Sequence, residues 1–202
     1  MSAFICHPPK ADIFRTYPDM TTEKLIEGLI NQDKEAIRTL VNTFQHPVIK
    51  TAYYFVGNME DAEDLSQEVM LEILRSIGKC NNPGNFKSWI YRITVNKSLD
   101  HLRRQKRRNI FVRLEALMRI SSNGEKNYML DAETSDSGEE YDEKKKLLDN
   151  AIDSLPENQK TALILCKFEE LSYLETAEIM GLSLSSVESL IFRAKKICNR
   201  NL

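Results

Sequence analysis

The chain has 202 residues, of which 42% are hydrophobic and 29% are charged, and its formal net charge is −2. This composition is typical of a soluble, helix-rich protein with one large or two small domains. No apolar run is long enough to span a bilayer, and residues 1–20 lack the apolar core of a signal peptide. We therefore expect a cytoplasmic protein.

Cysteine and histidine residues, which could serve as nucleophiles, catalytic bases or metal ligands, are scattered along the chain. The cysteines form no CxxC pair, which favours reduced thiols over disulfides or a zinc site (Cys6, Cys80, Cys166 and Cys198). His46 and His101 are isolated and are expected to be packing or surface residues. The chain shows no nucleophile–base pair, no phosphate-binding loop and no metal-ligand spacing. We expect a protein that is not an enzyme and needs no metal or other cofactor.

The charges are segregated along the sequence. Lysine and arginine residues cluster in the RRQKRR run at 103–108 and again at 193–200, whereas aspartate and glutamate residues cluster at 61–72 and 131–143. This separation suggests more than one kind of partner.

Helices are expected along most of the first half, after an extended arm at residues 1–20 in which prolines oppose a helix. A helix should begin after Thr21 or Thr22 as N-cap, and a second should begin near Lys34. Pro47 is expected to restart or bend the second helical path.

A third helix is expected over residues 59–78, where apolar residues recur at helical spacing. Asp64, Gln67 and Glu68 lie on adjacent turns and form one polar, acidic face. Spacing by itself favours a face that is simply solvated. A di-metal carboxylate site is not indicated, because the segment has no Glu-x-x-His pair.

Aromatic and basic residues alternate in the next segment. After a loop at residues 79–85, a helix is expected over 86–108. One of its faces is left for solvent or a polyanion, and its residues are Lys87, Tyr91, Arg92, Lys97, Arg103 and Arg104. Aromatic faces for stacking and cations for phosphates are what single-stranded or distorted DNA requires. The alternative is a core helix that ends in a basic cap, which explains Trp89 but not the length of the basic run.

The pattern then weakens over residues 109–143, which are read as a flexible acidic linker between two domains, with a short helix as an option at FVRLEALMRI near its start. The C-terminal domain, residues 144–202, closes with two short helices around a tight turn. Ala177 is small where the helices would cross, Gly181 suits a turn of positive φ, and Val187 gives the second helix an apolar underside. This spacing is that of a DNA-reading helix-turn-helix.

Four segments, in order, resemble the extracytoplasmic-function group of bacterial sigma factors in the sigma-70 family. They are DAEDLSQEV, FKSWIYRITVNKSLDHLRRQKRR, LPENQKTALIL and LSYLETAEIMGLSLSSVESLIFRAKK. The likeness covers residues 21–108 and 144–200. It implies an all-α fold of two small domains, sigma region 2 at 21–108 and a helix-turn-helix (winged-helix-like) sigma region 4 at 144–202. It also implies binding to core RNA polymerase and to promoter DNA.

The resemblance assigns roles residue by residue. Asp64, Gln67 and Glu68 match the segment that docks on the clamp helices of the polymerase β′ subunit, which replaces the solvated-face interpretation. The loop and the helix after it match the part that captures an unstacked base of the −10 element and lies along its phosphates. The residues expected there are Asn81, Asn82, Trp89, Arg92, Asn96, Arg103 and Arg104.

The second helix of the helix-turn-helix is expected to read the −35 element through Ser185, Ser186, Glu188, Ser189, Phe192, Arg193 and Lys196. Glu188 and Leu190 depart from the family. Its members usually carry a basic residue at the position of Glu188, and often another at the position of Leu190. Glu188 can accept from a cytosine amino group, so it is expected to redirect specificity. The polymerase β flap and an anti-sigma factor are further partners that the resemblance implies.

Two alternatives stay open on the residues themselves. A stand-alone helix-turn-helix regulator would bind an operator as a dimer, but it leaves the acidic Asp64 face and the Trp89 helix unexplained. A helical adaptor that binds no DNA is favoured only by Glu188 and Leu190.

Overall fold

The computed structural model describes residues 21–80, 82–120 and 150–201, and the side chains of 112–120 and 201 are not described. Within these ranges the backbone forms helices and turns with no β-strand, so the all-α expectation is confirmed. No described helix is both long and apolar enough to cross a membrane. The expected arm at 1–20, Asn81 and the part of the expected linker beyond Ile120 lie outside the described residues.

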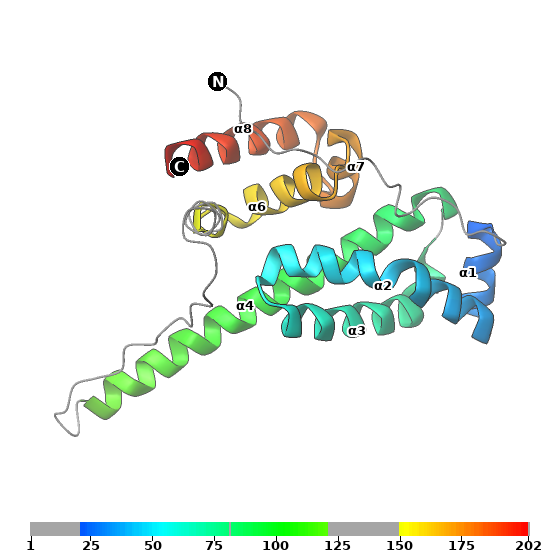
Figure 1. Ribbon diagram of the computed structural model, residues 1–202, viewed down its shortest axis with the longest axis horizontal. Coiled ribbons are helices and arrows are strands. Elements are labelled where there is room, and N and C mark those ends of the chain that lie inside the picture. Colours follow the sequence, from blue (N-terminus) through cyan, green and yellow to red (C-terminus); the bar gives the residue numbers. More distant parts are fainter. Residues whose placement is uncertain (1–20, 81, 121–149, 202) are drawn as a thin grey trace, which may run out of the picture.

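The first helical unit contains four α-helices and two 3₁₀ turns (Figure 1). Buried residues from all four α-helices form its main core, among them Leu25, Leu40, Ile73 and Phe86. The elements are α1 (Thr22–Ile30), α2 (Lys34–Val56), α3 (Met59–Ser76), η1 (Ile77–Lys79), η2 (Pro83–Asn85) and α4 (Phe86–Ile120).

Local sequence signals set the ends of these helices. The side chains of Thr21, Asp33 and Asn58 accept hydrogen bonds from the first turns of α1, α2 and α3. Gly57 ends α2 in the left-handed region at φ 81°, a conformation that glycine adopts without steric cost. The expectation that Pro47 restarts the helix is wrong: α2 runs through it without interruption, and Pro47 is buried in the core side of the helix.

Helix α4 is the longest element and projects beyond α2 and α3 (Figure 1). Its helical path continues past Arg108, where the sequence interpretation places the start of the linker, as far as Ile120. The residues in between include good helix formers and no proline or glycine, so nothing local ends the helix at Arg108.

The second unit contains residues 150–153, which are helical, followed by α6 (Glu157–Leu163), the π-helical turn η3 (Ile164–Phe168), α7 (Tyr173–Met180) and α8 (Leu184–Asn201). Helices α7 and α8 form the expected helix-turn-helix. Ser172 and Glu175 form a capping box at the start of α7, and Gly181 ends it at φ 65°. Ala177 and Val187 are buried together beneath the turn. Within residues 150–201 no strand forms a wing.

The two units pack directly against each other. Helices α6 and α7 lie over α2 and the first half of α4 (Figure 1), and α4 contacts α7. A shared apolar cluster fills the boundary, with Phe55, Tyr91 and Val95 from the first unit and Ile164, Leu165, Leu171 and Ile179 from the second. The sequence interpretation expected two domains but gave no sign of this common core.

Candidate nucleic-acid and polymerase interfaces

Helix α8 presents one exposed face that contains the residues expected to read DNA. Val187, Ile191 and Ala194 are buried against the rest of the second unit. The opposite face is formed by Ser185, Glu188, Ser189, Phe192, Arg193 and Lys196, all exposed, and Ser186 is half-buried at its margin. Phe192 is 71% exposed, which is unusual for an aromatic side chain and leaves it available for apolar contact with a base.

The two departures from the family lie in different environments. Glu188 is exposed on the same face as Ser185 and Phe192. Leu190 is half-buried and packs against the small core formed around Ala177 and Val187. The change at Leu190 therefore serves packing, whereas Glu188 alters the charge of the exposed face.

The acidic residues of α3 are arranged as the helical spacing predicted. Asp64, Gln67 and Glu68 are exposed, while Leu65 and Val69 between them are buried. Glu68 itself and two neighbouring acids also contact α4. Lys97 Nζ lies 3.7 Å from a carboxylate oxygen of Glu68 and 3.7 Å from one of Glu72, and His101 Nε2 lies 3.4 Å from Asp61 Oδ2. The face is anionic and stands on a rigid helix.

The loop before α4 is built around Asn82, whose side chain accepts a hydrogen bond from Gly84 N at 2.9 Å. Trp89 follows in the first turn of α4. Its ring stacks on Phe86, with centroids 6.1 Å apart, and it packs half-buried against the first core. Trp89 therefore combines the core role and the exposed surface that the sequence left as alternatives.

The expected phosphate-facing residues of α4 fall into two groups. Asn96 and Arg104 are exposed. Arg92 and Arg103 are exposed as well, but each also bonds to the second unit: Arg92 Nε donates to Ile179 O at 3.1 Å, and Arg103 Nε donates to Glu157 Oε2 at 3.1 Å. The expectation that Tyr91 faces solvent or a polyanion is wrong, because Tyr91 is buried in the boundary cluster.

Glu169 is the partner of Tyr91 across this boundary. Its carboxylate accepts a hydrogen bond from Tyr91 Oη at 3.0 Å and lies 3.8 Å from Lys50 Nζ. Burial raises the pKa of Glu169, and the positive charge of Lys50 and the Tyr91 hydrogen bond oppose that shift only in part. The pKa of Tyr91 is raised as well, first by burial and then by the Glu169 charge.

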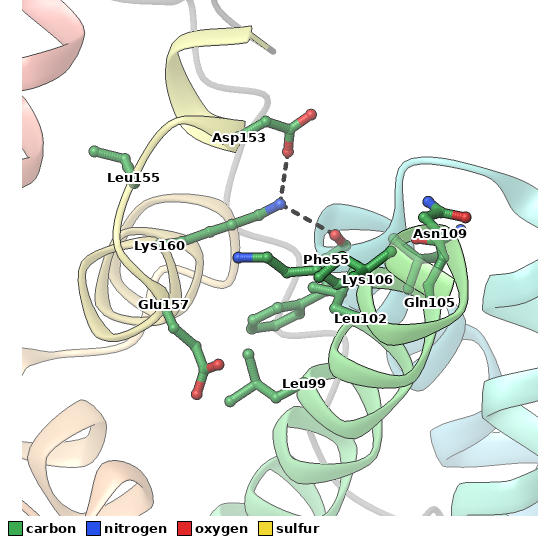
Figure 2. A pocket seen from close by; sticks show the side chains of 12 residues that line it. Phe55, Leu99, Leu102, Gln105, Lys106, Asn109, Asp153, Leu155, Glu157 and Lys160 are labelled. Atoms are coloured by element: carbon green, nitrogen blue, oxygen red, sulfur yellow. Dashed lines mark hydrogen bonds and ion pairs between the residues drawn. The ribbon is translucent and has the colours of Figure 1, made fainter. Parts of the chain in front are cut away.

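A pocket of about 570 Å³ lies between the units, beside Lys160 (Figure 2). Lys160 is only 8% exposed, and its Nζ donates to Asp153 Oδ1 at 2.7 Å and to Phe55 O at 3.1 Å. Sequence reasoning missed Lys160, Glu157 and Glu169, since no local pattern distinguishes them from surface charges. Among the described residues, no cluster of histidine, cysteine and carboxylate side chains could hold a metal ion.

Comparison with known proteins finds two family models on the chain, in order: sigma-70 region 2 over residues 40–108 and sigma-70 region 4 over residues 145–198. The RNA polymerase sigma-H factor of Pseudomonas aeruginosa is 31% identical over 180 residues, covering 89% of this chain and 93% of that relative. The sigma factor SigV of Bacillus subtilis is 31% identical over 81% of this chain and 89% of its own. The ECF RNA polymerase sigma-E factor of Escherichia coli K12 is 30% identical, over 88% of this chain and 92% of its own length.

Solved structures agree on the fold. CnrH, solved in complex with the cytosolic domain of CnrY, matches with a TM-score of 0.58 and 21% identity over 87% of this chain and 93% of that one. The sigma factor RpoE of Bartonella quintana was solved with the anti-sigma factor NepR. It matches with a TM-score of 0.55 and 18% identity, over 81% of this chain and 94% of that one.

Proposed function

Since the chain belongs to the extracytoplasmic-function group of the sigma-70 family, we propose that it binds core RNA polymerase, directs it to promoters through −10 and −35 elements, and helps to open the −10 DNA. The division into region 2 at residues 21–108, a linker at 109–143 and region 4 at 144–202 is part of this proposal. Helix α4 continues into the first part of that proposed linker, as far as Ile120.

Region 2 supplies the first two contacts. The exposed acidic face at Asp64, Gln67 and Glu68 is proposed to dock on the basic clamp helices of the β′ subunit, because opposite potentials attract and orient the partners. The Asn81–Asn82 loop and α4 are proposed to hold an unstacked base and its phosphates. Trp89 is only half-buried, and Asn96 and Arg104 are exposed, so all three can take part in these contacts.

Region 4 supplies the third contact, with α8 in the major groove at the −35 element. The observation that carries the proposal is the separation of the two faces of α8. Its buried face is wholly apolar or small, and its exposed face contains six of the seven residues that the family resemblance assigns to the −35 element, with Ser186 half-buried at its margin. An α-helix fits the major groove and can contact base edges along one such face.

An anti-sigma factor is a further proposed partner. Two solved relatives of the same fold were captured with other chains, CnrH with the cytosolic domain of CnrY and RpoE with the anti-sigma factor NepR. The polymerase β flap is proposed as the site that holds region 4 in the initiation complex.

The test is transcription in vitro with purified bacterial core polymerase and a library of promoter fragments. A sigma factor gives transcripts only when core and this chain are both present, and the active fragments share two separated sequence elements. Tight operator binding in the absence of core, with no transcription, would support a stand-alone regulator instead.

A further inference from the structure

Helix α4 continues beyond the part of the chain that matches sigma-70 region 2. The match ends at residue 108, whereas the helix ends at Ile120, and its far end projects away from α2 and α3 (Figure 1). The roles that the family resemblance assigns on this helix stop at Arg104. The described side chains that follow it are exposed, apart from the half-buried Gln105.

Two large apolar residues lie in this stretch and have different surroundings. Ile110 is 50% exposed and lines the pocket beside Lys160. Phe111 is 69% exposed and is not among the residues that line that pocket. A single exposed apolar side chain is ordinary on a protein surface, so Phe111 has meaning only through its neighbours.

The neighbours of Phe111 on the helix surface are cations. Arg104, Arg107 and Arg108 lie within the two helical turns before it, and all three are exposed. At 3.6 residues per turn these four side chains fall within an arc of about 100°. Guanidinium groups neutralise phosphates and an aromatic ring contacts bases, so this face has the chemistry of a nucleic-acid contact.

This face continues the one on which Trp89 and Asn96 lie. From Trp89 to Phe111 the helix makes about six turns, which brings Phe111 to within about 40° of the direction of Trp89 and about 33 Å farther along. Asp100 lies on the same side, but Arg103 pairs with it at 3.1 Å and offsets its charge. Ten base pairs of duplex DNA cover about 34 Å, so DNA that follows α4 from Trp89 reaches Phe111 about ten base pairs away.

We propose that Arg107, Arg108 and Phe111 form a further DNA contact, to the double-stranded spacer on the −35 side of the −10 element. The inference rests on the proposed function for the place of the −10 DNA at Trp89. The direction follows from the order of the chain, because α4 leads to the unit that is proposed to read the −35 element. The arginines bind phosphates of the spacer, and the ring of Phe111 packs against a base edge.

The double variant Arg107→Gln/Arg108→Gln removes two charges from this face and leaves every residue that the family resemblance assigns unchanged. The matched control Lys24→Gln/Lys34→Gln removes two charges from exposed side chains of α1 and α2. Binding of the holoenzyme to a promoter duplex is measured by fluorescence anisotropy at several salt concentrations. The arginine variant should bind several-fold more weakly, and its slope of log K against log salt should be smaller by about 1.8, because two phosphate contacts are lost. The control should match wild type in both.

Phe111→Ala tests the apolar part of the contact. It should weaken promoter binding several-fold and leave the salt slope as in wild type, because no charge is removed. The control is Ile30→Ala, at a side chain of α1 that is 54% exposed, and it should bind as wild type does.

The position of the contact is tested on the DNA. Uncharged methylphosphonates replace the phosphates in a short window about ten base pairs from the −10 element, on the −35 side. Wild-type holoenzyme should bind this duplex more weakly than the native promoter. The arginine variant should bind the two duplexes equally well, since it no longer contacts those phosphates.

Three results overturn the proposal. They are a wild-type salt slope for the arginine variant, an equal loss of affinity by wild type and variant on the methylphosphonate duplex, and weakened co-elution of the variant with core polymerase. The last result would mean that the polymerase, and not DNA, covers this face. Failure of the proposed function is distinguished by the wild type itself, which then forms no core-dependent promoter complex, and both ideas fall together.

Discussion

At the residue scale, Glu169 is a buried carboxyl at the boundary between the units, where burial and nearby charges act on its pKa in opposite directions. Its side chain is 4% exposed and faces Lys50, Thr51 and Tyr91, with the charge of Lys87 also acting on it. Burial outweighs these favourable contacts and raises its pKa above 4.5. A carboxyl with a raised pKa stabilises the folded state most when protonated, below its unfolded pKa, and this stability is lost as pH rises through the folded pKa.

We therefore expect Glu169→Gln to raise the melting temperature at pH 7 to 8 and to flatten its dependence on pH above about 4.5. Glutamine can still accept the hydrogen bond from Tyr91 but carries no buried charge. Thermal unfolding of both proteins between pH 4 and 8 measures this. A lower melting temperature for the variant at pH 7 would show that the Lys50 ion pair outweighs the cost of burial.

Among the residues proposed to face the −35 element, Glu188 is the one that departs from the family in charge. It is an exposed acid on the α8 face that also carries Ser185, Ser189 and Phe192. A carboxylate accepts from a cytosine amino group, whereas arginine donates to guanine.

Glu188→Arg is thus expected to shift the preferred −35 sequence, with discrimination at one base pair changing by about 1–3 kcal/mol. Sequencing of transcripts from a randomised −35 library, with wild-type and variant holoenzyme, measures the preference. Lys167→Met, a charge change away from the α8 face, is the control and should leave the preference as in wild type. An identical profile for Glu188→Arg would mean that this side chain does not face bases.

At the scale of elements, α1 and α2 meet so closely that only glycine fits at one position. A Cβ added at Gly28 would lie 2.7 Å from Ala36 Cβ, well inside ordinary contact distance. At Gly78, in η1, an added Cβ would have no neighbour within 4 Å.

We expect Gly28→Ala to lower the free energy of unfolding by about 1–3 kcal/mol through overpacking. The control Gly78→Ala should be neutral or should stabilise by up to about 1 kcal/mol, because alanine restricts the unfolded chain. Urea unfolding followed by circular dichroism measures both. Equal effects at the two positions would contradict the close helix contact.

The proposed docking surface of helix α3 is a single face, because Asp64, Gln67 and Glu68 are exposed together on a helix whose other side is core. The double variant Asp64→Lys/Glu68→Lys reverses that charge without touching a buried residue. We expect it to stay folded and to lose co-elution with core polymerase, as like charges repel.

The matched control is Glu23→Lys/Glu27→Lys, which makes the same change at the same spacing on the exposed side of α1. It should co-elute with core as wild type does. Retained co-elution of the α3 variant would rule out this face as the docking site.

At the scale of the whole molecule, sequence and structure agree where information is local. Caps at Asp33 and Asn58, the turn at Gly181 and the two faces of α8 follow from neighbouring residues, and all could be predicted. The burial of Tyr91 could not be predicted. Its partner Glu169 lies 78 residues away, and helical periodicity does not say whether a second unit covers a polar face of the helix. The candidate sites were placed by family motifs, and the contacts that occupy Arg92 and Arg103 became visible only in three dimensions.

The most direct test of the account is a footprint of the holoenzyme on a promoter selected by transcription. With core and this chain together, we expect two separate protected segments, at the −35 and −10 elements, and permanganate-reactive thymines within the second. Protection of one segment only, or the same footprint from the chain without core, would contradict a two-point promoter contact that depends on the polymerase.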